Sequence, residues 1–205
     1  MAKISWLELS KVEGDGDATV NVSALEHTGR SDREITLVWS GDNVTPVNRK
    51  VKQLGKAEFV QIPDTEYTIS QTGGTLSISG TSNSKTLYFS KQGSGTLNID
   101  TPTTYYIGSA VIKNGEGHEG DPGKEQQYEF RIVFDIPANE GLVDKTVDFM
   151  ICGNNTDIKD YFTIKSSKAS ATLSVTPEEG FVLNAEGGTA VFEVDSNIHW
   201  KIKAL

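Results

Sequence analysis

The chain has 205 residues, of which 36% are hydrophobic, and its formal net charge is −9 at pH 7. This length allows one large domain or two small ones. The negative charge argues against nucleic acid as a partner, because a phosphate backbone is bound by Lys and Arg. The start, Met1-Ala2-Lys3-Ile4-Ser5-Trp6, has no apolar signal-peptide core, and no stretch is long enough to span a membrane, so we expect neither export by a signal peptide nor a membrane partner.

Along the chain, short runs of alternating apolar and polar residues are separated by clusters rich in Gly, Asp and Asn. Such alternation buries one face of a β-strand and exposes the other, and no segment has a helical period. The sequence therefore predicts an all-β protein. The clearest alternating runs are residues 19–24, 75–79 and 129–136, and the clearest turn clusters are residues 13–17, 40–43, 71–74 and 153–155.

The sequence also matches itself at two offsets, which indicates an internal repeat. At an offset of 114, Pro63, Tyr67, Ile69, Gly73-Gly74-Thr75 and Ser82-Asn83 match Pro177, Phe181, Leu183, Gly187-Gly188-Thr189 and Ser196-Asn197. At an offset of 112, Val20, Val22, Gly29, Asp32, Ile35, Leu37, Gly41 and Lys56-Ala57 match Ile132, Phe134, Gly141, Asp144, Val147, Phe149, Gly153 and Lys168-Ala169.

The two matches together define three regions. Residues 58–168 are predicted to form one complete unit of seven to nine strands. Residues 1–57 match only the second half of that unit, and residues 170–205 match only its first half. We therefore expect tandem immunoglobulin-like β-sandwiches, one complete and one split between the two chain regions.

Two sets of residues in the flanking regions carry a family resemblance. In the carboxy-terminal region they are Thr172-Leu173-Ser174-Val175-Thr176-Pro177, Gly187-Gly188-Thr189 and Ser196-Asn197 before Trp200; in the amino-terminal region they are Trp6-Leu7-Glu8-Leu9-Ser10, Gly14-Asp15-Gly16, residues 28–36 and residues 51–55. The first set resembles the opening half of a BACON domain, and the second set resembles its closing half. The resemblance implies immunoglobulin-like modules of Bacteroidetes surface proteins and of the phages that infect those bacteria. The middle unit departs from the pattern, since Thr86 or Leu87 stands near the place of the Trp and residues 114–127 form a long insert.

Half of a sandwich exposes an apolar sheet face and unpaired strand edges. We therefore expect the carboxy-terminal half to be completed by an amino-terminal half through strand complementation. The complement comes either from the same chain or from a neighbouring copy; an end-to-end string of modules favours the neighbouring copy. The residues expected at this contact are Trp6, Leu7, Leu9, Phe192, Val194, Trp200 and Ile202.

Candidate ligand sites are few, and no motif for catalysis or for zinc occurs in the sequence, so we expect no enzyme activity and no cofactor. In the insert, Glu116, Glu119 and Asp121 are weak candidates for a calcium site, although their spacing fits no EF-hand. Trp39, at a predicted strand end, and His118, in the insert, are candidate contacts for a glycan or a partner.

Two functions follow as expectations. In the first, the chain is a non-enzymatic structural protein of a bacteriophage virion, such as a capsid decoration, head fibre or tail component, that forms homo-oligomers and contacts other virion proteins. In the second, it is a carbohydrate- or mucin-binding module of a Bacteroidetes surface protein. That alternative places it at the bacterial cell surface in contact with a host-surface glycan, and it requires a signal peptide ahead of Met1.

Overall fold

The structure is a computed structural model that describes residues 5–204. It confirms the predicted all-β class, because fifteen strands make up the fold and the helical content of the described range is a single 3-10 turn. The elements are β1 (Leu7–Leu9), β2 (Val22–Ala24), β3 (Arg33–Trp39), β4 (Val47–Gln53), β5 (Val60–Gln61), β6 (Glu66–Ile69), β7 (Gly74–Ser82), β8 (Tyr88–Gln92), β9 (Thr104–Ile107), β10 (Ala110–Lys113), η1 (Pro122–Lys124), β11 (Tyr128–Ile136), β12 (Lys145–Cys152), β13 (Lys159–Ser166), β14 (Leu173–Thr176) and β15 (Glu193–Ser196).

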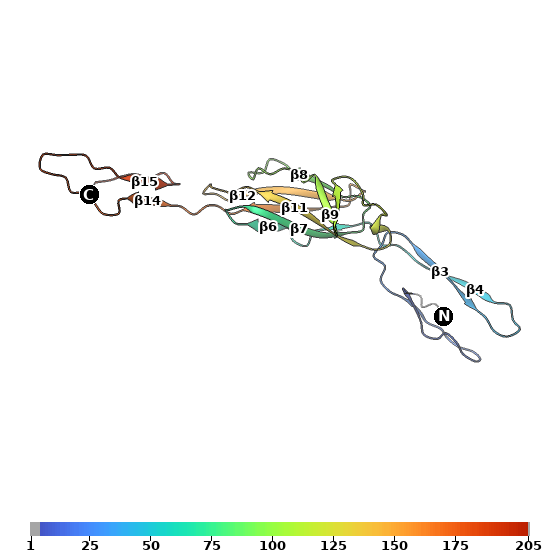
Figure 1. Cartoon of the computed structure of the whole chain (residues 1–205). Helices are drawn as coiled ribbons and strands as arrows, with labels where there is room; N and C mark the ends of the chain where they lie inside the picture. The colour runs from blue at the N-terminus through green and yellow to red at the C-terminus, as the bar shows by residue number, and fades with distance from the viewer. Residues whose placement is uncertain (1–4, 205) are drawn as a thin grey trace.

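Strands β5 to β13 form a central sandwich of two sheets (Figure 1). One sheet has the strand order β10-β9-β11-β7-β5, and the other has the order β6-β13-β12-β8. The longest pairing joins β7 to β11, from Gly74 opposite Ile136 to Ser82 opposite Tyr128. Strand β11 alternates buried and outward-facing residues along its whole length, as its sequence pattern predicts.

The hydrophobic core lies between the two sheets and is rich in aromatic rings. The ring centroids of Phe134 on β11 and Phe149 on β12 are 5.0 Å apart, and those of Phe89 on β8 and Tyr105 on β9 are 5.6 Å apart. The Tyr105 hydroxyl donates a 2.7 Å hydrogen bond to the backbone oxygen of Glu116, and burial raises the pKa of Tyr105 to about 12. These contacts give the central sandwich a packed core of its own.

The remaining strands form three separate two-stranded ribbons, β1–β2, β3–β4 and β14–β15. Figure 1 shows the two amino-terminal ribbons, in blue, extending from one end of the sandwich, and the carboxy-terminal ribbon, in red, extending from the opposite end. An isolated two-stranded ribbon is marginally stable in water unless its apolar face is covered. The described part of the chain contains no helix with the length and hydropathy needed to cross a membrane.

Candidate assembly site

The β3–β4 ribbon repeats the pairing of β12 with β13 in the central sandwich. Leu37 lies opposite Arg49, and the corresponding pair is Phe149 opposite Phe162. Strand β3 therefore matches β12 at an offset of 112, whereas β4 matches β13 at an offset of 113. The sequence match of Lys56 with Lys168 is thus wrong by one residue, because the segment between the paired residues Ile151 and Asp160 contains one residue more than the segment between the equivalent pair Trp39 and Val47.

The β3–β4 ribbon and the β12–β13 hairpin each have an aspartate with the same hydrogen bonds at the end opposite the turn. Each carboxylate accepts one hydrogen bond from a backbone N–H and one from a lysine: Asp32 from Gly55 (2.9 Å) and Lys52 (2.5 Å), Asp144 from Lys168 (2.9 Å) and Lys165 (3.1 Å). The pKa of Asp32 is lowered, chiefly by the hydrogen bond from Lys52, and the pKa of Asp144 is lowered, chiefly by the backbone hydrogen bond from Lys168. The β3–β4 ribbon thus shares its strand pairing and its aspartate hydrogen bonds with the β12–β13 hairpin of the sandwich.

The β14–β15 ribbon in turn repeats the start of the central sandwich. In both places the side-chain oxygen of an asparagine accepts a hydrogen bond from a backbone N–H. The hydroxyl of the preceding serine donates to the backbone oxygen of that same residue. Asn83 Oδ1 accepts from the Phe59 N–H (2.9 Å) and Ser82 Oγ donates to the Phe59 oxygen (2.8 Å), while Asn197 Oδ1 accepts from the Thr172 N–H (2.8 Å) and Ser196 Oγ donates to the Thr172 oxygen (2.9 Å). The carboxy-terminal ribbon is therefore equivalent to β5 and the end of β7.

Equivalent apolar positions differ sharply in burial between the sandwich and this ribbon. The alternation of apolar residues after the Ser-Asn pair aligns Trp200 with Leu87 and Ile202 with Phe89, and the offset of 114 aligns Phe192 with Ile78. The exposed fractions are 0% for Ile78, 0% for Leu87 and 4% for Phe89, against 49% for Phe192, 42% for Trp200 and 83% for Ile202. The ribbon lacks the second sheet that covers these positions in the sandwich.

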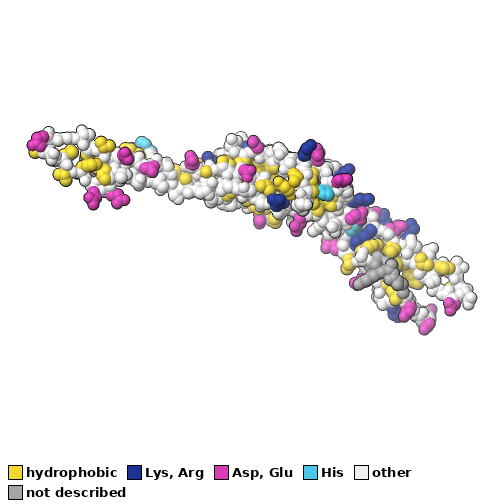
Figure 2. All heavy atoms as spheres, viewed as in Figure 1, with side chains coloured by type: hydrophobic (Ala, Val, Ile, Leu, Met, Phe, Trp, Pro, Cys, Tyr) yellow, Lys and Arg dark blue, Asp and Glu magenta, His cyan; other side chains and the backbone are white. Residues whose placement is uncertain are grey.

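These side chains form one continuous apolar surface, which we call the carboxy-terminal face. Figure 2 shows hydrophobic side chains in yellow along this ribbon. The face contains a hollow of about 260 Å³, lined mainly by Leu173, Val175, Phe192, Val194, Trp200 and Ile202. Four of the residues predicted at the contact, namely Phe192, Val194, Trp200 and Ile202, are thus brought together here.

The amino-terminal ribbons present a second apolar surface, which we call the amino-terminal face. Leu7 is buried and Leu9 is half-buried. Trp6 is also half-buried, and the Arg33 guanidinium lies 4.6 Å from the centroid of its ring. Trp39 is 42% exposed, although its counterpart Ile151 in the sandwich is fully buried. The face is therefore partly covered near Trp6 and open near Trp39.

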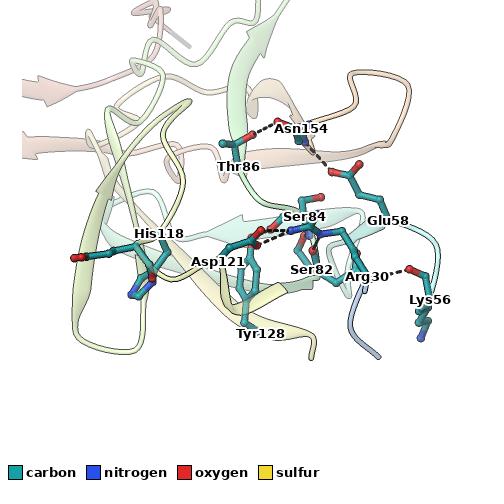
Figure 3. Close-up of polar contacts among 12 residues, drawn as sticks. Arg30, Lys56, Glu58, Ser82, Ser84, Thr86, His118, Asp121, Tyr128 and Asn154 are labelled. Carbon is teal, nitrogen blue, oxygen red and sulfur yellow. Dashed lines mark hydrogen bonds and ion pairs between the residues drawn. The ribbon is translucent and has the colours of Figure 1, made fainter. Parts of the chain in front are cut away.

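A polar network joins the amino-terminal ribbons to the central sandwich (Figure 3). The Arg30 guanidinium donates to both carboxylate oxygens of Asp121, at 2.5 and 2.7 Å, and its Nε donates to the backbone oxygen of Asn83. The Arg30 backbone N–H also donates to the Gly123 oxygen at 3.0 Å. The insert at residues 114–127 thus packs against the connection between β2 and β3.

Asn83 is the centre of this junction and is fully buried. Its Nδ2 donates to the backbone oxygens of Thr28 (3.1 Å) and Ala57 (3.2 Å). These bonds tie the sandwich to both chain segments that enter the amino-terminal ribbons. Sequence reasoning missed this role of Asn83 and Arg30, although the recurrence of the Ser-Asn pair was a usable signal for the asparagine.

The weak calcium candidates do not form a cluster. Asp121 is paired with Arg30, and the Glu116 carboxylate lies 3.6 Å from the Lys113 ammonium. Within residues 5–204, no three His, Cys, Asp or Glu side chains gather closely enough to hold a metal ion. A ring nitrogen of His118, the other candidate contact in the insert, is hydrogen-bonded to the backbone oxygen of Glu119. Burial raises the pKa of the Cys152 thiol, which disfavours the thiolate needed for nucleophilic chemistry.

Comparison with known proteins gives structural likenesses only. No protein-family model matches the chain, and no curated protein matches it. An NMR structure of a protein from Bacteroides thetaiotaomicron is 17% identical, covers 56% of this chain and 92% of its own, and has a TM-score of 0.27. The endo-fucoidan hydrolase MfFcnA9 from glycoside hydrolase family 107 is 13% identical with a TM-score of 0.28, and a variant of MfFcnA4 from the same family is 12% identical with a TM-score of 0.31. Each match covers 82% of this chain but only 26% and 23% of the respective hydrolase.

Proposed function

We propose that this chain is a non-enzymatic structural protein that builds an oligomer through its sandwich units, as a component of a bacteriophage virion. One observation carries the proposal. The flanking ribbons expose apolar side chains at positions where the central sandwich, built from the same repeat, buries them. Contiguous exposed apolar surface of this kind marks an interaction site.

Strand edges support the same function. Ribbons β3–β4 and β14–β15 each have two edges that belong to no larger sheet. In the sandwich, the equivalent strand β12 has neighbours on both sides, β13 and β8. Unpaired edges template the addition of further strands. Assembly that adds the missing strands would give hydrogen-bond partners to the backbone N–H and C=O groups at these edges, and it would cover the apolar faces.

The virion setting rests on the resemblance to BACON domains, which phages of Bacteroidetes carry. Mass spectrometry of purified particles of a phage that encodes the chain tests this setting. We expect the chain as a stoichiometric component of the particle. Its presence only in the unassembled fraction of the lysate would contradict a virion role.

The assembly itself is testable by fluorescence, because all three tryptophans, Trp6, Trp39 and Trp200, lie in the flanking regions. Tryptophan emission therefore reports on the ribbons alone. As the concentration of the chain is raised, we expect the emission to shift to shorter wavelength while sedimentation velocity shows growing oligomers. A single monomeric species with unchanged emission over the whole range would refute the structural role.

A carbohydrate-binding function is the second candidate, and the exposure of Trp39 favours it, since an exposed indole can stack on a sugar ring. A mucin or polysaccharide pull-down separates the two functions. Retention that is lost in Trp39→Ala, with oligomer formation unchanged, would favour glycan binding over assembly.

A further inference from the structure

We propose that the occupant of the carboxy-terminal face is the amino-terminal face of a second copy of this chain, docked in one register that places Phe192 opposite Val20 and Ile202 opposite Trp39. This inference rests on the proposed function and names its partner. The two faces are equivalent to the two halves of the central sandwich, and that sandwich therefore supplies the template for their contact.

The first pairing follows from β7 and β11. In the sandwich, Ile78 lies opposite Ile132, and both side chains are fully buried. Phe192 is equivalent to Ile78 at the offset of 114, and Val20 is equivalent to Ile132 at the offset of 112. Transferring the register therefore puts Phe192 opposite Val20.

The second pairing follows from β8 and β12. Phe89 lies opposite Ile151 in the sandwich. Ile202 is equivalent to Phe89, and Trp39 is equivalent to Ile151 because β3 matches β12 at the offset of 112. Ile202 and Trp39 are the side chains that the separate ribbons leave open, with 83% and 42% of their surface exposed. In this register the two exposed side chains become neighbours on paired strands, as Phe89 and Ile151 are in the sandwich.

One position departs from the template. Arg49 stands where the sandwich has Phe162. Phe162 packs edge-on against Tyr67, with ring centroids 6.0 Å apart, and Tyr67 is equivalent to Phe181. In the docked pair the Arg49 guanidinium would therefore lie against the Phe181 ring, a cation–π arrangement that buries its aliphatic stem.

The placement of the faces favours contact between two copies. The amino-terminal and carboxy-terminal ribbons extend from opposite ends of the sandwich (Figure 1). Strand β13 ends at Ser166 and β14 begins at Leu173, so the connection over residues 167–172 spans at most about 25 Å, which is shorter than the roughly 30 Å length of a nine-residue strand such as β11. The connection is also fixed, because the Ala169 N–H donates to the Gly141 oxygen at 2.8 Å. The carboxy-terminal ribbon therefore lies away from the amino-terminal ribbons of its own chain, which favours a second copy as the occupant.

The test is disulfide cross-linking of the full chain in the predicted register. The variant carries Val20→Cys with Phe192→Cys, and Cys152 is kept because it is buried. The control carries Val20→Cys with Val191→Cys. Val191 is more exposed than Phe192, at 66%, but its counterpart Ser77 faces away from the core. Random collision would therefore cross-link the control at least as well as the variant.

Under mild oxidation, we expect the Phe192→Cys variant to give a ladder of covalent dimers and larger species on a non-reducing gel, at least tenfold more than the control. A disulfide closed within one chain, seen as a faster-migrating monomer without a ladder, would overturn the second copy as occupant. Equal ladders for both variants, or no cross-link in a chain that still oligomerises by sedimentation, would overturn the register while leaving the structural function standing. No cross-link, together with an unsubstituted chain that stays monomeric by sedimentation, would overturn both.

Discussion

Replacing Phe192 by Ala and, separately, Ile78 by Ala compares one repeat position in two settings. Ile78 is fully buried in the central sandwich, and truncating a buried Ile to Ala costs about 2–5 kcal/mol of unfolding free energy. Phe192 is half exposed in its ribbon, where it contacts the Phe181 ring at a centroid distance of 4.9 Å. Truncating Phe192 should therefore leave the stability of the sandwich unchanged.

Assembly is where Phe192→Ala should act. Full burial of a Phe side chain stabilises by up to about 3 kcal/mol, and about half of that remains to be gained when a second sheet covers Phe192. The cavity left by the truncation adds to the loss, which gives about 2 kcal/mol in total. This loss corresponds to about a 30-fold weaker association between copies.

Two probes separate the effects. Urea unfolding followed by tyrosine fluorescence reports on the central sandwich, since all six tyrosines lie within residues 58–168. Sedimentation equilibrium reports on association. Phe192→Ala should change only the association constant, whereas Ile78→Ala should lower the urea midpoint. If Phe192→Ala destabilises the sandwich as much as Ile78→Ala does, or leaves association intact, the equivalence of the two positions is refuted.

Two further predictions concern the polar contacts. Asn83→Ala leaves the Phe59 N–H and several backbone oxygens without a hydrogen-bond partner in a buried junction, so it should lower the unfolding free energy of the sandwich by about 3 kcal/mol. The exposed equivalent Asn197→Ala should leave the tyrosine-detected urea midpoint unchanged within error. Equal losses for both variants would contradict the assigned role of Asn83. Asp144→Asn should lower the urea midpoint at neutral pH. The pKa of Asp144 is lower in the folded protein than in the unfolded chain, so its carboxylate stabilises the fold at every pH above the unfolded pKa. This stabilisation is lost as the pH falls through the lowered pKa, so the two midpoints should converge in acid, and a difference that persists at the lowest pH would count against the hydrogen bonds to Asp144 as its cause.

The strand content was predictable because alternation is a local property of the sequence. The period-two pattern of residues 129–136 corresponds to β11, and its inward positions Phe130, Ile132 and Phe134 are in the core. The internal repeat was visible for the same reason, since Gly, Pro and Asn at turns recur at fixed offsets. What alternation cannot supply is the register between strands, and the one-residue shift between β4 and β13 appeared only in the pairing.

The junction was not predictable because it joins residues that are far apart in the sequence. Arg30 and Asp121 are separated by 91 positions, and neither belongs to a motif. The acidic insert offered oxygen atoms as candidate calcium ligands, yet Asp121 is paired with an arginine from the connection between β2 and β3. A single sequence shows the charge of each residue but not its partner. The offset of 112 already aligned Trp39 with Ile151, but the burial of Ile151 against the exposure of Trp39 could be read only from the structure.

The recurrence of the junction bonds has a consequence for the shape of an oligomer. The Lys56 N–H donates to the Gly29 oxygen at 2.8 Å, and the Ala169 N–H donates to the Gly141 oxygen at the same distance. The same contact thus stands where the amino-terminal ribbons meet the sandwich and where the sandwich meets the carboxy-terminal ribbon. A docking between copies that places one end of each chain on the other end of the next is heterologous, and a heterologous contact closes into a ring or continues as a filament. Along such a string, a sandwich completed by two copies would alternate with the central sandwich of one copy. Because the junctions between them are equivalent, successive sandwiches would differ little in orientation. Sequence repeat, register and junction therefore all favour an extended row of sandwiches.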